Sequence, residues 1–169
     1  MAELKHLSTA WDVDRFIVLE EEKLVVIRFS AYEGGLQRLS RKKENGTLEA
    51  DEDEAVEEHF RNTAIMDDTL VKVAPLVRKF CTIYAVDINE VPDFNQLYEL
   101  HDPADPFAVM FFYKNKHMKV DLKTGNNNKI NFPISDPEQL IIIIQEVFLA
   151  GKKKQNMVRS QLSFSNVRR

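Results

Sequence analysis

The sequence predicts an α/β domain in which helices flank both faces of a mixed central β-sheet. Three observations lead to this expectation. Short runs rich in β-branched and aromatic residues alternate with longer segments whose apolar residues recur at helical spacing. A helical segment separates the first two of these runs, which predicts a parallel crossover. Two later runs are separated by only three polar residues, which predicts an antiparallel hairpin.

The first half of the chain contains helix, strand, helix and strand in order. Residues 11–18 are a short helix candidate, and residues 23–29, KLVVIRF, have the composition of a buried strand. A second helix is expected over residues 66–80, where Pro75 should kink or locally break it. Residues 81–88, CTIYAVDI, predict the second strand.

The second half adds strands that follow one another closely. Residues 91–100 predict a helix that carries Pro92 in its first turn. Residues 108–113 and 117–122 predict two strands joined by the turn KNK, and the sequence KINF predicts a brief further strand.

The last predicted helix has signals at both ends. Ser135 or Asp136 is the expected N-cap, and Gly151 is the expected residue after the last turn. Its apolar face should cover the sheet and consists of Leu140, Ile141, Ile144, Val147 and Phe148. The complete order of elements is that of the thioredoxin arrangement, although the same alternation also fits other small α/β folds.

Residues 30–65 interrupt this pattern. The segment has no apolar periodicity, contains a basic run, and then places seven acids in the ten residues 49–58. Long unpatterned segments inside a compact domain are usually functional or disordered. We therefore expect an inserted charged surface loop, with a short helix near residues 55–60.

The charge is uneven along the chain. The whole chain carries −4, but residues 152–169 contain six basic residues and no acid, so residues 1–151 carry −10. We therefore expect a domain over residues 1–151 and a basic C-terminal tail over residues 152–169. Two alternatives remain for the tail, which either contacts RNA or an acidic protein surface, or is a solvated and partly disordered terminus.

Several function classes lack support in the sequence. No run of about 18 apolar residues predicts a membrane span, and the start of the chain has no targeting pattern. The chain contains one cysteine and four scattered histidines, which excludes an intramolecular disulfide and gives no metal-ligand spacing. The acids of the insertion lack the spacing of a calcium loop. We expect no cofactor.

Longer motifs carry a resemblance to a known family. The sequences HLSTAWDVD, VVIRF, IYAVDINEVPDFNQLYELHDP and VMFFYKNKHMKVDLKTGNNNKINF resemble the Dim-one-type thioredoxin-like spliceosomal proteins, which include the fifteen-kilodalton component of the U-five small nuclear ribonucleoprotein (snRNP). The resemblance covers most of the chain outside residues 30–65 and the last ten or so residues. The charged insertion departs from the family pattern, and a small extension at residues 104–107 does so as well.

The resemblance implies a thioredoxin fold used as a non-enzymatic interaction module in pre-mRNA splicing. It implies a nuclear protein packed into the tri-snRNP, with the large U-five scaffold protein and neighbouring subunits as partners. A closely related paralogous branch of the family is an alternative, but NEVPDF and GNNNKIN favour the main branch.

Redox chemistry is the alternative from another class. A thioredoxin carries its two cysteines just after the first central strand, where this chain reads FSAYEGGLQ without sulfur. A single-thiol redox protein would have to use Cys81, which opens a predicted buried strand and is expected to be a small core residue. The position of the thioredoxin cis-proline falls near Phe107 and Ala108, beside Pro106.

The sequence TGNNNKI is the last candidate site. It has one glycine and leads into a short strand, so it does not fit a phosphate-binding P-loop. Asparagine tolerates left-handed backbone, which predicts a tight turn that also presents exposed amides and Lys129 to a partner. The predicted partner-binding residues are Gly125, Asn126, Asn127, Asn128 and Lys129 of this loop, and Lys152, Lys153, Lys154 and Arg159 of the tail.

Overall fold

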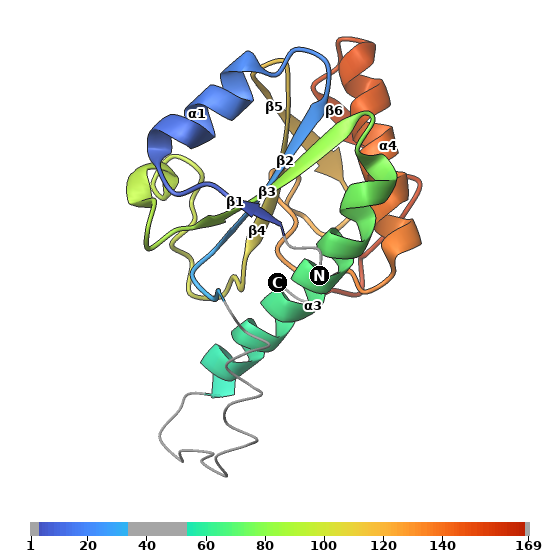
Figure 1. Cartoon of the computed structure of the whole chain (residues 1–169). Helices are drawn as coiled ribbons and strands as arrows, with labels where there is room; N and C mark the ends of the chain where they lie inside the picture. The colour runs from blue at the N-terminus through green and yellow to red at the C-terminus, as the bar shows by residue number, and fades with distance from the viewer. Residues whose placement is uncertain (1–3, 34–53, 168–169) are drawn as a thin grey trace.

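A computed structural model describes residues 4–33 and 54–167, and these residues form one mixed six-stranded sheet in the order β1-β3-β2-β4-β5-β6 (Figure 1). β3 is parallel to both β1 and β2, β4 is antiparallel to β2 and β5, and β6 is parallel to β5. This topology confirms the expected thioredoxin arrangement. The strands are β1 (Lys5–His6), β2 (Leu24–Ser30), β3 (Cys81–Asp87), β4 (Ala108–Tyr113), β5 (Lys116–Asp121) and β6 (Met157–Arg159).

Helices lie on both faces of the sheet, as predicted. Helix α1 (Ala10–Leu19) packs on one face, and helices α3 (Glu54–Val77) and α4 (Pro137–Lys152) pack on the other (Figure 1). Side chains of β2 alternate between the two faces because successive residues of a strand point to opposite sides. Val25, Ile27 and Phe29 join the α1 side, and Leu24 and Val26 join the α3/α4 side.

Helix α4 begins as its sequence predicts and ends differently. Asp136 is the N-cap, and its carboxylate accepts a hydrogen bond from the backbone N–H of Glu138 at 2.9 Å. The expectation that Gly151 follows the last turn is wrong, because α4 continues through Lys152. A Cβ at residue 151 would lie 2.6 Å from Cδ2 of Tyr113, so glycine is required by the contact between helix and sheet.

The segment predicted as an inserted loop is partly helical. Residues 34–53 lie outside the described residues, but α3 already begins at Glu54, so residues 54–65 are not loop. The expected short helix near residues 55–60 is the first part of this longer helix. Glu54 and Glu57 in the first turn complement the helix dipole, which explains how an acid-rich sequence begins a helix. Pro75 does not break the helix, which continues to Val77, so the effect of its missing N–H is confined to the last turn.

Two other predicted elements are absent from the described residues. The helix expected over residues 91–100 is wrong, since only a short 3-10 helix, η1 (Pro92–Phe94), forms there before a series of turns. Glu99 has φ 54°, which is incompatible with a right-handed helix. The strand expected at KINF is reduced to one bridge between Ile130 and Val109.

The described part of the predicted basic tail packs onto the domain. β6 extends the sheet beside β5, and the Ser160 hydroxyl donates to Glu146 of α4 at 2.5 Å. The ring of Phe164 lies 5.1 Å from that of Phe132, centroid to centroid. Of the two alternatives for this segment, a solvated and partly disordered terminus does not fit residues 157–167.

A buried cation lies at the centre of the α3 side. The Arg28 side chain on β2 is 1% exposed and donates to both carboxylate oxygens of Asp67 on α3, at 2.8 and 3.0 Å. It also donates to both carboxylate oxygens of Glu33, at 2.7 and 3.0 Å. Burial by itself lowers the pKa of Arg28, but the two carboxylates outweigh this effect and the pKa is raised. Arg28 therefore stays charged and connects β2, α3 and the chain that follows β2.

Replacing Asp67 by asparagine tests the energetic weight of this cluster. Asp67→Asn leaves the buried guanidinium with one carboxylate, so we expect the free energy of unfolding to fall by about 3 kcal/mol. The neighbouring Asp68 pairs with Lys72 at 2.8 Å, where both side chains are more than half exposed, so Asp68→Asn should change it by less than about 0.5 kcal/mol. Urea unfolding measures the free energy of unfolding of both variants, and equal values would contradict the stabilising role of Asp67 beside Arg28.

Candidate functional site

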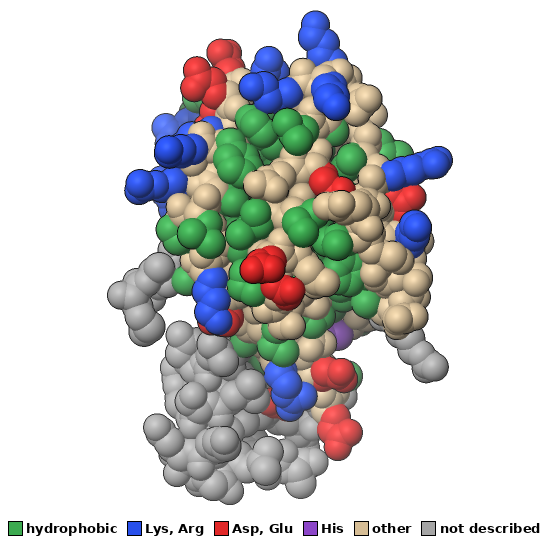
Figure 2. All heavy atoms as spheres, turned by 90° about the vertical axis from the view of Figure 1, so that its right-hand side faces the viewer, with side chains coloured by type: hydrophobic (Ala, Val, Ile, Leu, Met, Phe, Trp, Pro, Cys, Tyr) green, Lys and Arg blue, Asp and Glu red, His purple; other side chains and the backbone are tan. Residues whose placement is uncertain are grey.

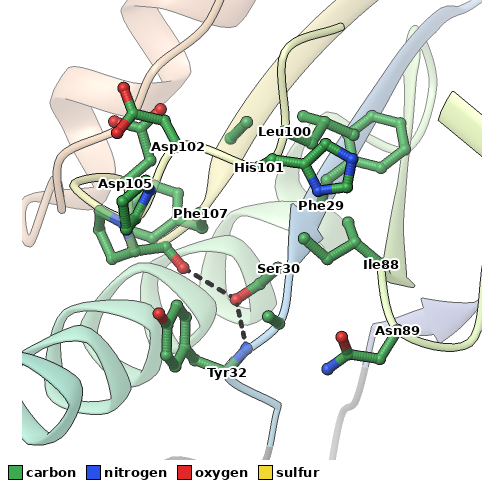
Figure 3. Close-up of a pocket in the computed structure, with 14 residues that line it drawn as sticks. Phe29, Ser30, Tyr32, Ile88, Asn89, Leu100, His101, Asp102, Asp105 and Phe107 are labelled. Carbon is green, nitrogen blue, oxygen red and sulfur yellow. Dashed lines mark hydrogen bonds between the residues drawn. The ribbon is translucent and has the colours of Figure 1, made fainter. Parts of the chain in front are cut away.

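A pocket opens at the carboxyl end of β2, where the thioredoxin arrangement carries its chemistry. Its volume is about 270 Å³, and it lies between the ends of β2 and β3 and the segment that leads into β4 (Figure 3). His101, Ile88 and Asn89 lie on one side of it, and Asp102, Asp105 and Phe107 lie on the other, with Ser30 between them (Figure 3). We call this the β2-end pocket.

Hydrogen bonds fix the floor of the β2-end pocket. The Ser30 hydroxyl donates to the carbonyl of Pro106 at 2.9 Å and accepts from the backbone N–H of Tyr32 at 2.9 Å. The Thr63 hydroxyl of α3 donates to the same carbonyl at 3.1 Å. The Ser30 and Thr63 hydroxyl oxygens lie 3.5 Å apart. Pro106 precedes β4 as expected, and every described peptide bond is trans.

The two segments that depart from the family pattern meet beside this pocket. The Thr63 hydroxyl of α3 donates to the carbonyl of Pro106 in the extension. Nε2 of His59, in the first part of α3, donates to the carbonyl of Pro103, just before the extension, at 2.8 Å. The ring of Tyr32 lies 5.1 Å from that of His59 and 5.2 Å from that of Phe60. Sequence analysis identified both departures but not these contacts. The signal was the occurrence of two extra segments in one chain, which could have suggested that they pack together.

Cys81, the residue required by the redox alternative, lies at the other end of the sheet. It pairs with Leu24 at the start of β2, six residues before Ser30. Its side chain is 2% exposed, and burial raises the pKa of its thiol to about 12, against a smaller opposing effect of Lys23. The thiol is therefore protonated near pH 7 and lies far from the β2-end pocket.

The asparagine loop folds back along β5. The backbone N–H of Val120 donates to the carbonyl of Asn127 at 3.0 Å, and Nε2 of His117 donates to the carbonyl of Asn128 at 2.8 Å. Burial lowers the pKa of His117, so its ring is neutral near pH 7. The side-chain oxygen of Asn126 accepts from the backbone N–H of Asn128 at 3.0 Å, which closes a local turn.

The expected turn is present, but the residues with left-handed backbone are not the predicted asparagines. None of the three asparagines has a positive φ, which occurs instead at Gly125 (91°) and Lys123 (64°). The expectation that Lys129 presents an exposed amine is wrong. Lys129 is 8% exposed, and its ammonium donates to the carbonyl of Glu99 at 2.6 Å and lies 3.5 Å from Asp105. Gly125 and Asn128 are the exposed positions of the loop.

The structure separates the basic residues that the sequence grouped as one tail. Lys152, Lys153 and Lys154 lie at the C-terminal end of α4, level with the turn between β4 and β5. Arg159 pairs in register with Asp121 at the opposite end of β5. These residues therefore do not form one contiguous site.

The described residues contain no group of three or more His, Cys, Asp or Glu side chains placed to hold a metal ion. None of the described helices is long and apolar enough to cross a membrane.

Comparison with known sequences identifies a family. Residues 57–164 match the family described as "Mitosis protein DIM1". The chain is 41% identical over 162 residues to "Spliceosomal protein DIB1" of Eremothecium gossypii, covering 96% of this chain and 93% of that one. It is 39% identical to "Mitosis protein dim1" of Schizosaccharomyces pombe, covering 96% and 94%. Identity to "Thioredoxin-like protein 4B" of Mus musculus is 24%, covering 97% and 91%.

Comparison with solved structures supports the fold. A chain from a study of thiol resolution in yeast mitochondrial 1-Cys peroxiredoxin by the glutathione and thioredoxin systems superposes with a TM-score of 0.51. Its sequence identity is 14%, and the match covers 84% of this chain and 93% of that chain.

The state of Cys81 can be tested by alkylation. Because its thiol is buried and protonated, iodoacetamide at neutral pH should modify the native protein roughly three orders of magnitude more slowly than the protein in denaturant. Intact-mass measurement over time gives both rates, and glutathione in the same tube checks the reagent. Native and denatured rates within a factor of about ten would contradict the described burial.

Proposed function

The chain belongs to the DIM1 family, and from this membership we propose that it is a non-enzymatic interaction subunit of the splicing machinery that works in the nucleus. The observation that carries the proposal is the identity of about 40% over nearly the whole length of proteins named for the spliceosome. We further propose the U-five snRNP and the tri-snRNP as its particles, and the large U-five scaffold protein as its chief partner.

The carboxyl end of β2 supports the non-enzymatic part of the proposal. Disulfide exchange needs an accessible thiolate, and Ser30, Ala31 and Tyr32 supply no sulfur where thioredoxins have one. The Ser30 hydroxyl is occupied by backbone groups. Arg28 donates hydrogen bonds to the carboxylates of Asp67 and Glu33, which gives these three groups a structural role.

Two alternatives are less well supported. The paralogous branch, represented by thioredoxin-like protein 4B, shares 24% identity with this chain, whereas the DIB1 sequence shares 41%. A single-thiol redox function would require Cys81, whose burial and raised pKa disfavour it.

For partner contact we retain the exposed part of the asparagine loop. Asn128 is exposed, and its side chain makes no hydrogen bond with the described residues. An exposed amide can donate to and accept from a partner at the same time. RNA contact by Lys152, Lys153 and Lys154 remains a second proposal.

Affinity purification of the tagged chain from nuclear extract tests the proposal. We expect recovery of the U-five RNA and the large scaffold protein, detected by RNA sequencing and mass spectrometry. Asn128→Ala should reduce this recovery because it removes an exposed amide from the loop. Asn156→Ala is the matched control, since Asn156 is also exposed but lies outside the loop, and its backbone carbonyl still accepts from Lys119 in the variant. Absence of the particle from the wild-type sample would overturn the proposal.

Reduction of insulin by dithiothreitol tests the redox alternative. We expect the purified chain to leave the rate of insulin precipitation at the uncatalysed level, because it has no thiolate at the carboxyl end of β2. A thioredoxin serves as the positive control. Acceleration that disappears in Cys81→Ser would contradict the non-enzymatic assignment.

A further inference from the structure

One end of the molecule gathers the starts of two strands and the ends of two helices. β2 and β3 begin side by side, with Leu24 opposite Cys81, and β4 ends opposite Lys116 of β5. The last turn of α4 contacts Tyr113 at the end of β4. Figure 1 shows these points together at the top, away from the β2-end pocket. We call this region the basic end.

Seven exposed cations from three separate segments lie at the basic end. They follow α3, form the turn between β4 and β5, and follow or complete α4, and Lys and Arg side chains stand along the upper end of the molecule in Figure 2. None of them has a carboxylate within 4 Å among the described residues. The seven residues are Arg78, Lys79, Lys114, Lys116, Lys152, Lys153 and Lys154.

Two of these cations are held above adjoining aromatic rings. Nζ of Lys114 lies 5.7 Å from the ring centroid of Tyr113, and Nζ of Lys152 lies 5.5 Å from that of Phe148. The two rings meet edge to face with their centroids 5.8 Å apart. The turn between the strands and the end of α4 therefore present their charges on one continuous surface.

Stabilisation of the ends of α3 and α4 explains only some of these seven cations. Lysine and arginine at the C-terminal ends of α3 and α4 complement the helix dipoles, and this effect falls off within the last turn. Lys114 lies in the turn between β4 and β5 and Lys116 begins β5, so no helix dipole favours either charge. Seven like charges at one end also repel one another, which raises the free energy of the folded chain unless an anion is present.

Three acids precede β2 at this end, and the described residues show no ion pair between them and the seven cations. Residues 20–22 are all glutamates in the connection between α1 and β2. The Glu20 carboxylate accepts from the backbone N–H groups of Glu22 and Lys23 at 3.1 and 3.2 Å, so it closes its own turn. The cations on the α3 and α4 side remain without carboxylate partners among the described residues.

We propose that the basic end binds the phosphate backbone of an RNA strand without reading its sequence. Ammonium groups on flexible side chains suit an extended polyanion, because each can neutralise a different phosphate. A protein partner would need apolar anchors seated in pockets. Two pockets of the described residues, one at the end of β2 and one against Phe16 and Leu19 of α1, are lined by none of the seven cations.

The choice of RNA over another polyanion rests on the proposed function, whereas the anion-binding surface itself rests on the geometry. The surface differs from the tail proposed from the sequence, because it adds four cations from other segments and excludes Arg159, which lies at the far end of β5.

Fluorescence anisotropy with a labelled uridine oligonucleotide tests the proposal on the full chain. The test variant is Lys114→Gln/Lys116→Gln/Lys153→Gln. The matched control, Lys5→Gln/Lys123→Gln/Arg159→Gln, removes the same charge from exposed cations away from the basic end. Each lost phosphate contact removes about 0.7 from the slope of log affinity against log salt, so the test variant should lose about two units of slope and at least about tenfold in affinity.

Each outcome decides a different point. A loss of affinity and of salt slope that is confined to the test variant supports RNA binding by the basic end. Equal losses of affinity in both variants, or no binding of the oligonucleotide by the wild type at about 50 mM salt, would overturn the proposal. If polyglutamate displaces the oligonucleotide as well as unlabelled RNA of equal charge does, the surface is for an acidic protein and the RNA assignment is wrong. Recovery of the U-five particle without RNA binding would leave the proposed function intact and remove only this inference.

Discussion

The burial of Arg28 is the constraint on which the α3 side of the molecule depends. A guanidinium without water needs compensating charge and several acceptors, and here Asp67 and Glu33 supply both. The bonds set the position of α3 over β2, and they fix where the chain leaves the sheet. Ser30 then lies against Pro106, which closes the floor of the β2-end pocket. At the carboxyl end of β2, where thioredoxins carry their cysteines, this chain therefore has polar groups that hydrogen-bond to one another.

The sequence predicted the elements that bury many side chains and missed those that bury few. β2, β3 and β4 are covered on both faces, so their composition identified them without knowledge of the fold. The first part of α3, up to Asn62, contains no fully buried residue and is acid-rich, so no apolar periodicity marked it. β1 and β6 contain two and three residues, too few for a period to show. Residues 91–100 have helical composition, but tertiary contacts override it, since Tyr98 packs against Phe29 of β2 at 6.0 Å and Phe112 of β4 at 5.9 Å.

The candidate sites also differ in whether their structure depends on neighbouring residues or on residues distant in the sequence. The turn at Gly125 followed from one glycine and its neighbours. The burial of Lys129 did not, because its acceptor is the carbonyl of Glu99, thirty residues earlier in the chain. The β2-end pocket and the basic end each combine segments that are distant in sequence and brought together by strand order. Such sites could be predicted only after the topology was known.

The pairing of β6 with β5 has a consequence for how this protein can meet its partners. The edge of an open sheet can pair with a strand of another protein, because unpaired backbone groups there can continue the hydrogen-bond ladder of the sheet. In this fold the chain's own β6 occupies one border, and the two residues of β1 form the other. Both borders are too short to template a long added strand. Recognition then depends on side chains displayed by turns and helix ends, so surface substitutions can remove one contact at a time and leave the sheet unchanged.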